Sequence, residues 1–302
     1  MFAITARGLG QISRGKRQVS RSTMRLLPGG YGTVSLGAGV QVQPLGFGTW
    51  SWGNKVLWGY DESLDGELQY AFERAIEPSG PLGLGGGRYF FDTGDSYGTG
   101  ELEGRAEALL GRFRSETRVP RRAVIGTKLA VYPNRLSGGS FEAACRASLD
   151  RMGRDRMELV QAHWPAVKFQ PWQEGALWDG LARCYEAGLA DAVGTSNYGP
   201  VQLRKIAAYM KERGVPLVSN QVQFSLLSME PLDSGLFDAC AELGISPIGY
   251  SPLALGLLTD RYDVSAGGDG SRLPDGPRGL LFAPPRRAAV AAAGFHPGPA
   301  DH

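Results

Sequence analysis

Two patterns of hydrophobic and polar positions alternate along this chain. Short runs of apolar and β-branched residues predict buried strands, and longer stretches with apolar residues at every third or fourth position predict amphipathic helices. The expected strands lie near 45–49 and at 88–93, 123–129, 158–163, 191–196, 217–223 and 246–252. The expected helices lie at 64–77, 101–113, 140–152, 173–187, 200–213 and 233–243.

The regular alternation of strand and helix predicts a parallel sheet covered by helices. Seven such strands favour a (β/α)₈ barrel, with an open Rossmann-type sheet as the alternative. No G-x-G-x-x-G follows the first strand and opens a helix, and the glycine run at 83–87 comes before a strand, which is typical of a surface insertion. Apolar alternation about Gly37–Gly39 predicts a small hairpin that leads into the first strand.

Polar side chains recur where the predicted strands end. In a barrel the active site lies at the C-terminal ends of the strands. We therefore expect one site at this end of the barrel. In chain order its candidate residues are Asp92 with Tyr97, Lys128, His163, Ser196 with Asn197, Gln221, and Tyr250 with Ser251.

These residue types suit proton transfer to a carbonyl oxygen. A tyrosine with a pKa of about 10 is a weak acid, and the ammonium of Lys128 is expected to lower the pKa of Tyr97. Asp92 would hold Lys128 charged, and His163 would orient the carbonyl oxygen or share the proton. No side chain donates hydride, so a nicotinamide cofactor is implied. The alternatives are a helix-capping Asp92, a Schiff-base Lys128 and a hydrogen-bonded core His163.

Composition narrows the class of protein. With 302 residues, 42% of them hydrophobic, the chain can bury one large core, and no stretch approaches eighteen uninterrupted apolar residues, so no membrane span is expected. The three cysteines are scattered without C-x-x-C spacing. They are interpreted as buried apolar residues, and no metal site is predicted.

The charge is distributed unevenly. No acidic residue precedes Asp61, whereas residues 1–30 contain six basic ones, so the net charge of +2 becomes −4 without them. An acid-free segment with Arg and Ser predicts a disordered organellar transit peptide, with an untargeted basic start as the alternative. No basic patch remains in the rest of the chain, so nucleic-acid binding is not expected.

Six segments together carry a family resemblance. They are FDTGDSYGTGELEGRAEALLGRF (91–113), GTKLA (126–130), QAHWP (161–165), VGTSNYGP (193–200), SNQVQFSLL (219–227) and GYSPLALGLLT (249–259). In order and spacing the sequence resembles the aldo-keto reductases over about 42–282, and in particular the organellar members of plants and green algae. The resemblance implies the (β/α)₈ TIM barrel of that family and a soluble protein of the chloroplast or another organelle.

The resemblance also implies roles for the candidate residues. Tyr97 matches the general acid of the family, within a tetrad whose other members match Asp92, Lys128 and His163. The implied cofactor is NADPH, the implied reaction is reduction of aldehydes or ketones, and the implied partner is a small-molecule carbonyl substrate. Ser196, Asn197 and Gln221 match the positions that hold the nicotinamide carboxamide, Tyr250 matches the aromatic residue stacked on its ring, and Ser251 and Leu253 match pyrophosphate positions. The other implied cofactor-binding residues are Asp92 and, where the loop of the first strand meets the cofactor, Thr49 and Trp50.

The expected domain order is a leader at 1–30, an incomplete reductase domain at 31–282 and a divergent Ala- and Pro-rich tail at 283–302. Relative to the family, the chain is expected to lack the eighth strand and the C-terminal helices, which would leave two unpaired strand edges. The alternative function is therefore a catalytically weak or inactive binding protein. Trp52, Trp58 and Trp164 are candidates for an aromatic wall that suits a planar aldehyde.

Overall fold

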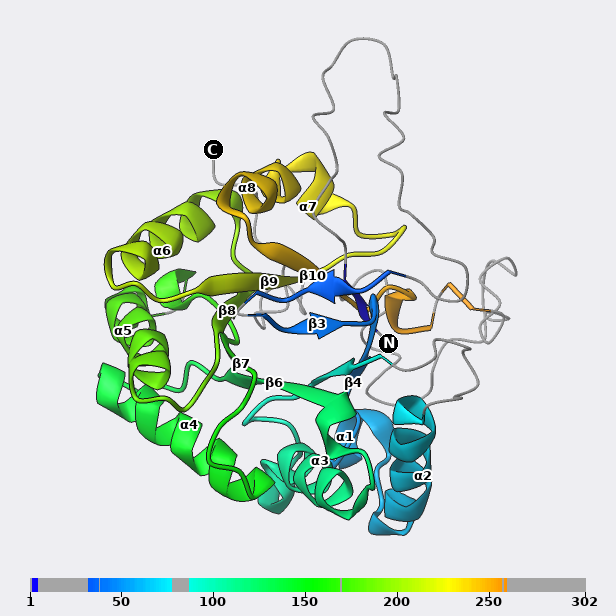
Figure 1. Ribbon diagram of the computed structural model, residues 1–302. Coiled ribbons are helices and arrows are strands. Elements are labelled where there is room, and N and C mark those ends of the chain that lie inside the picture. Colours follow the sequence, from blue (N-terminus) through cyan, green and yellow to red (C-terminus); the bar gives the residue numbers. More distant parts are fainter. Residues whose placement is uncertain are drawn as a thin grey trace, which may run out of the picture.

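Seven parallel strands form one curled sheet in the computed structural model, which describes residues 2–4, 32–37, 39–77, 87–168, 170–256 and 258–259 (Figure 1). Each strand pairs in parallel with the next along the chain. This confirms the predicted strands and excludes the open-sheet alternative, because the described sheet closes into a barrel. The strands are β4 (Leu45–Gly48), β5 (Tyr89–Asp92), β6 (Ala123–Leu129), β7 (Leu159–Ala162), β8 (Val193–Ser196), β9 (Leu217–Gln223) and β10 (Ser246–Tyr250).

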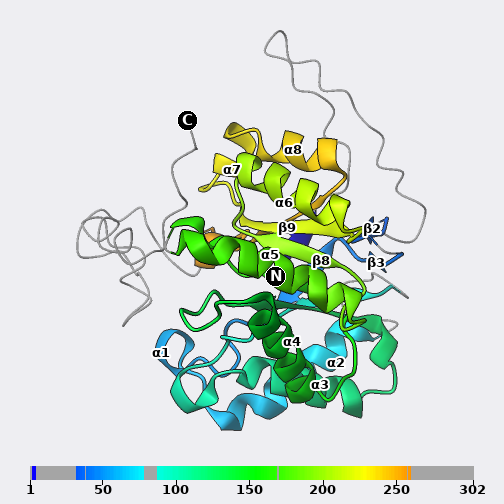
Figure 2. The same ribbon diagram turned by 90° about the vertical axis from the view of Figure 1, so that its left-hand side faces the viewer.

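Helices surround the sheet (Figures 1 and 2). The start of α4 follows from its sequence, because the side chains of Ser137 and Ser140 each accept a hydrogen bond from the backbone N–H of the other in a capping box. The helices are α1 (Lys55–Trp58), α2 (Asp65–Ile76), α3 (Arg105–Glu116), α4 (Gly138–Met152), α5 (Glu174–Glu186), α6 (Pro200–Glu212), α7 (Glu230–Asp233) and α8 (Leu236–Leu243). Short 3₁₀ turns lie at Glu62–Leu64, Gly100–Leu102, Pro120–Arg122, Ala166–Lys168, Pro171–Gln173 and Ala254–Gly256.

The barrel is closed by a strand that the sequence pattern did not predict. Strand β1 (Phe2–Ile4) runs antiparallel between β4 and β10, with Ala3 opposite both Leu45 and Gly249. The expected unpaired edges of β4 and β10 are therefore paired within the described part of the chain, which satisfies backbone groups that an open edge leaves exposed. Strand β1 lies within the predicted leader (1–30), so residues 2–4 form a strand where a disordered segment was expected. The other residues of that leader and the predicted tail (283–302) lie outside the described residues.

A two-stranded hairpin closes the N-terminal end of the barrel. Strands β2 (Val34–Ser35) and β3 (Gln41–Val42) pair antiparallel about the turn that the sequence predicted. Their apolar residues share a buried cluster with residues of the barrel strands, including Phe90 and Val218. Gly37 is required in this turn because its φ is 81° and a Cβ there would lie 2.2 Å from Cγ1 of Val218. The hairpin blocks one end of the barrel, so a ligand can enter at the other.

The main core lies between the sheet and the helices. Leu109 and Phe113 of α3, Phe141 of α4 and Leu181 of α5 are among its fully buried side chains. The three cysteines are buried and form no disulfide, consistent with their interpretation as apolar residues. No helix in the described part of the chain is both long enough and apolar enough to cross a membrane.

Candidate active site

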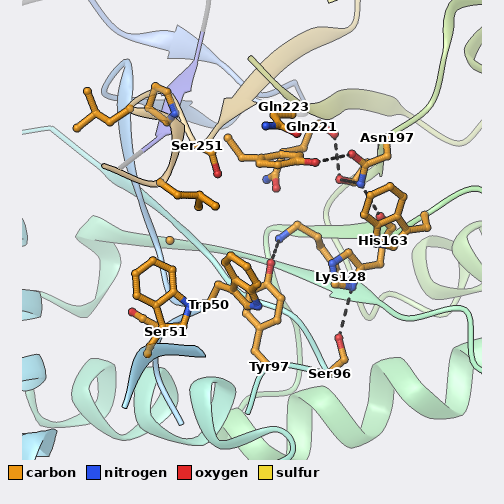
Figure 3. Close-up of a pocket in the computed structure, with 18 residues that line it drawn as sticks. Trp50, Ser51, Ser96, Tyr97, Lys128, His163, Asn197, Gln221, Gln223 and Ser251 are labelled. Atoms are coloured by element: carbon orange, nitrogen blue, oxygen red, sulfur yellow. Dashed lines mark hydrogen bonds between the residues drawn. The ribbon is translucent and has the colours of Figure 1, made fainter. Parts of the chain in front are cut away.

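A cavity of about 550 Å³ opens at the C-terminal ends of the strands (Figure 3). The barrel brings to it residues at the C-terminal ends of β4, β6, β8, β9 and β10 and in the loops after β4, β5, β7, β8 and β10, which are far apart in the sequence. It is lined by Gly48, Trp50, Ser51, Trp58, Ser96, Tyr97, Lys128, His163, Trp164, Ser196, Asn197, Gln221, Gln223, Tyr250, Ser251, Pro252, Leu253 and Leu255.

Most of the predicted site residues line this cavity, and two lie beside it. Asp92, at the end of β5, is fully buried and contacts the lining residues Lys128 and Gln221. Thr49 is also fully buried, and both its hydroxyl and its backbone N–H donate to the carbonyl oxygen of Asp92 at 3.0 Å. Thr49 therefore fastens the end of β5 and does not face the cavity.

The ammonium group of Lys128 donates hydrogen bonds to three partners. Its Nζ donates to Oδ2 of Asp92, to the carbonyl oxygen of Thr93 at 3.1 Å and to the phenolic oxygen of Tyr97 at 3.0 Å. Only 1% of the Lys128 side chain is exposed, so burial lowers its pKa while the carboxylate of Asp92 opposes that effect. Burial likewise raises the pKa of Asp92 against the effect of Lys128. The pair is thus a desolvated contact that orients the ammonium toward Tyr97.

Tyr97 differs from the expectation in its acidity. Its pKa is raised above the usual value, first by burial and then by the negative charges of Asp92 and Asp95. The prediction that Lys128 lowers the pKa of Tyr97 is wrong for this arrangement, because Asp92 offsets the ammonium charge and desolvation disfavours the phenolate. A phenol that stays protonated is the form that can donate a proton.

His163 is held as a neutral imidazole. Burial and, secondarily, the charge of Lys128 lower its pKa to about 3. Its ring meets that of Tyr97 edge to face, with ring centroids 5.7 Å apart, and its Nδ1 lies 3.4 Å from the Ser96 hydroxyl oxygen. A neutral imidazole carries one N–H, so His163 can donate one hydrogen bond and accept another.

The facing wall of the cavity presents amides, hydroxyls and an aromatic ring. The Tyr250 hydroxyl donates to Oδ1 of Asn197 at 2.9 Å, and Nδ2 of Asn197 donates to Oγ of Ser196 and to the carbonyl oxygen of His163, each at 3.1 Å. These bonds fix the amide of Asn197 at the cavity wall, where it lies in Figure 3, next to the Tyr250 hydroxyl.

Backbone strain concentrates at the same wall. Within the described ranges, the residues other than glycine with positive φ are Asn197, Ser251, Ala254 and Leu255. Such conformations cost on the order of 1–3 kcal/mol each and cluster at functional sites. Three of these four residues line the cavity. The strain therefore supports a functional role for this wall.

Tryptophan rings line another part of the cavity. Trp50 and Trp58 meet edge to face with centroids 5.7 Å apart, and Trp164 stacks on His163 at 6.4 Å. Trp52 was expected in this wall, but that expectation is wrong. It is only 7% exposed and packs on Phe113 in the core, while Trp50 takes its place in the wall.

Several lining residues were not predicted from the sequence. Gln223 follows Gln221 by two positions and so shares its face of β9, which strand periodicity would have revealed. Ser96 precedes Tyr97, and Ser51 follows Trp50, but neither shows a signal that separates it from an ordinary loop serine. Leu255 enters the lining through its left-handed backbone, which no residue preference indicates.

Comparisons with known proteins show what the chain is similar to. The sequence model described as "Aldo/keto reductase family" matches residues 44–275. The chain is 52% identical over 247 residues to "Pyridoxal reductase, chloroplastic" of Arabidopsis thaliana, an alignment that covers 80% of this chain. The chain spans 64% of that relative's length.

Solved structures share the fold. A thermostable aldo-keto reductase crystallised with the inhibitor epalrestat matches with a TM-score of 0.60 and 25% identity, covering 76% of this chain and 75% of its own. An aldo-keto reductase complexed with NADPH matches with a TM-score of 0.54 and 25% identity, covering 72% of this chain and 62% of its own.

Proposed function

Because the chain belongs to the aldo/keto reductase family, we propose that it reduces an aldehyde or ketone to an alcohol with NADPH, with Tyr97 as the proton donor. The observation that carries this proposal is the hydrogen bond of 3.0 Å from Lys128 Nζ to the Tyr97 phenol at the cavity wall, backed by the buried Asp92. A protonated phenol beside a fixed ammonium is poised to donate a proton, since the ammonium stabilises the phenolate that remains.

The residues around Tyr97 would divide the work of the proton transfer. Asp92 holds Lys128 charged and in place, and Lys128 in turn orients the phenolic oxygen. His163 is neutral, so it can donate one hydrogen bond to the substrate oxygen without bringing a second positive charge into the cavity. The substrate carbonyl oxygen would therefore lie between His163 and Tyr97.

The facing wall fits a nicotinamide. An amide and hydroxyls beside an aromatic face are the groups that would bind a ring bearing a carboxamide, and the cavity volume of about 550 Å³ lies within the usual range for ligand sites. We assign the carboxamide to Ser196, Asn197 and Gln221, ring stacking to Tyr250, and the pyrophosphate to the backbone about Ser251 and Leu253. When bound, NADPH supplies the hydride. Trp50 would border it, and Thr49 would contribute by fastening β5.

An enzyme assay tests the assignment of Tyr97. The full chain would be titrated with NADPH, following quenching of tryptophan fluorescence, and assayed with an aromatic aldehyde. We expect Tyr97→Phe to lower kcat by about 10²–10⁴-fold and to leave NADPH affinity within about twofold, because only proton donation is lost. Tyr209→Phe is the matched control, since Tyr209 lies on α6 and its hydroxyl contacts Arg213. Unchanged turnover in Tyr97→Phe would refute the assignment, and binding without turnover in the parent chain would favour a binding protein.

Planar aromatic aldehydes are the substrate class that we propose. Trp50, Trp58 and Trp164 provide apolar faces, while Ser96 and Gln223 supply hydrogen-bonding groups for ring substituents. The related Arabidopsis protein is named a pyridoxal reductase, and pyridoxal is such an aldehyde. We expect a higher kcat/KM for pyridoxal than for an aliphatic aldehyde of similar size, and the reverse order would argue against the aromatic wall.

We also propose that the protein acts in the plastid. The acid-free, basic start of the chain and the chloroplastic name of the relative support this. Fusing residues 1–30 to a fluorescent protein tests it, with plastid import as the expected result and cytosolic fluorescence as the contrary one.

A further inference from the structure

Asp95 is a buried acid that the proposed reaction does not use. It lies between Asp92 and Tyr97, in a turn closed by a hydrogen bond from the Tyr97 N–H to the Gly94 carbonyl oxygen at 3.0 Å. Only 4% of Asp95 is exposed. A carboxylate in such a place needs hydrogen bonds and a counter-charge, so its partners indicate its purpose.

Asp95 joins the turn that carries Tyr97 to the strand that carries Lys128. The Asp95 N–H donates to the carbonyl oxygen of Lys128 at 3.0 Å, and Oδ1 of Asp95 accepts from the Ala130 N–H at 3.0 Å. The two contacts flank the end of β6 on either side of Leu129. They connect the backbone two residues before Tyr97 with the backbone at Lys128 itself.

Arg135 completes this connection. Its Nη1 lies 2.5 Å from Oδ2 of Asp95 and donates to the carbonyl oxygen of Ala130 at 2.7 Å. Arg135 is itself held, because its own carbonyl oxygen accepts from Nε2 of the fully buried Gln173 at 3.0 Å. Nη1 of Arg135 thus contacts both the carboxylate of Asp95 and the backbone of Ala130, the two partners of the Asp95–Ala130 hydrogen bond.

We propose that the Asp95–Arg135 ion pair is a positioning element that sets the distance between the Tyr97 hydroxyl and the Lys128 ammonium. This inference rests on the proposed function, in which that distance governs proton donation. A displacement of about 1 Å in a reacting group can lower a rate by about 10²-fold. An ion pair that holds the backbone of the Tyr97 turn against the backbone at Lys128 therefore has a large effect on turnover. The charge of Asp95 also raises the pKa of Tyr97.

The chain contains a matched control at the opposite end of the same strand. Oε2 of Glu158 accepts from the Ile125 N–H at 3.1 Å and from Nη1 of Arg154 at 2.9 Å. This pair therefore also joins a buried carboxylate, an arginine and a β6 backbone N–H, but on the side away from the cavity. Glu158→Gln should reproduce the loss of a buried charge without touching the site.

The experiment compares Asp95→Asn, Arg135→Gln, Arg135→Lys and Glu158→Gln in the full chain. We expect Asp95→Asn and Arg135→Gln each to lower kcat by about 10–100-fold with NADPH affinity within about twofold, and their double variant to lose no more than the worse single one. Arg135→Lys, which keeps the charge, should recover most of the loss. Glu158→Gln should lower the melting temperature similarly and leave kcat within about twofold.

Hydrogen exchange provides a readout that does not depend on turnover. Asp95→Asn should accelerate exchange in residues 93–98 and 128–135 together, well below the melting temperature, and Glu158→Gln should not. Wild-type kcat in Asp95→Asn, or an equal loss in Glu158→Gln, would overturn the proposal. If the parent chain reduces no aldehyde, the proposed function fails, and the exchange data alone decide this inference: unchanged exchange in both segments would refute it.

Discussion

The Nζ atom of Lys128 donates to the phenolic oxygen of Tyr97 over 3.0 Å, although the two residues belong to different strand–loop units of the barrel. The bond exists because β5 and β6 are parallel neighbours, with Asp92 opposite Gly126, so both strands deliver their ends to one edge of the sheet. Asp92 accepts a hydrogen bond from the same ammonium and orients it toward the Tyr97 hydroxyl. The central contact of the site is thus a product of strand register.

Removing Lys128 should destabilise the fold as well as the site. Lys128→Met leaves Asp92 buried without its counter-charge, which costs about 3–5 kcal/mol of unfolding free energy. The double variant Asp92→Asn with Lys128→Met should recover part of that loss, because no uncompensated charge remains. Urea unfolding measures both. Arg204→Met, which breaks the exposed pair with Glu242, is the control and should cost no more than about 1 kcal/mol. Equal losses of unfolding free energy in Lys128→Met and Arg204→Met would contradict the argument that burial of Asp92 makes its counter-charge necessary.

Stability should depend on pH through His163. Its folded-state pKa of about 3 lies below the usual value, so between about pH 3 and 6.5 the unfolded chain binds a proton that the folded protein excludes. The contribution of His163 to the free energy of unfolding is complete above about pH 6.5 and is lost as the pH falls. The loss is at most about 1.4 kcal/mol per pH unit, and it is smaller here because His163 borders an open cavity.

Urea unfolding between about pH 5 and 7 checks this dependence. The parent chain should lose stability toward the acid end faster than His163→Gln does. Parallel pH profiles in the two proteins would show that His163 is not kept neutral by its surroundings.

The hairpin at the closed end of the barrel should tolerate substitution at one glycine and not at another. Gly37 and Gly39 both have positive φ, but only at Gly37 would a Cβ meet Val218, whereas nothing lies within 4 Å at Gly39. Gly39→Ala should cost about 1 kcal/mol from backbone strain alone, and Gly37→Ala about 1–3 kcal/mol more. Combining Gly37→Ala with Val218→Ala should restore the excess if the clash is its cause. Thermal unfolding measures each step.

The tryptophan wall should affect substrate affinity more than turnover. Trp58→Leu removes one ring of the Trp50–Trp58 pair, so we expect KM for an aromatic aldehyde to rise by about 3–10-fold with a smaller change in kcat. An aliphatic aldehyde should be affected less. Trp172→Leu is the control, because Trp172 is 70% exposed and does not line the cavity. An equal effect on both aldehydes would remove the case for aromatic stacking.

The strands could be predicted from the sequence because their patterns are local. Expected and observed limits agree exactly at 123–129 and 217–223 and nearly so elsewhere, since most of these strands are continuous buried runs. The helices follow similarly, with α3 shifted because its expected start is occupied by the 3₁₀ turn Gly100–Leu102. Strand β1 was not predicted, because three residues carry no period and its partners are distant in the chain.

The site was predicted only in part, because some of its features depend on contacts between residues that are distant in the chain. Residues at strand ends follow from the barrel rule, which placed Lys128, His163 and Gln221 correctly at the cavity. Features that depend on three-dimensional packing did not follow. The exchange of Trp52 for Trp50 in the wall and the direction of the Tyr97 pKa shift both depend on neighbours that no sequence pattern reveals.

The hydrogen bond from Gln221 to Asp92 connects residues 129 positions apart, across the interior of the barrel. Contacts between distant segments form late in folding, because a long loop must close before they can. Early folding intermediates would therefore contain much of the helical structure and no competent site. During refolding from urea, we expect the circular dichroism of the helices to recover before aldehyde reduction does. The time at which activity returns would then report when the segments that carry Asp92 and Gln221 come together.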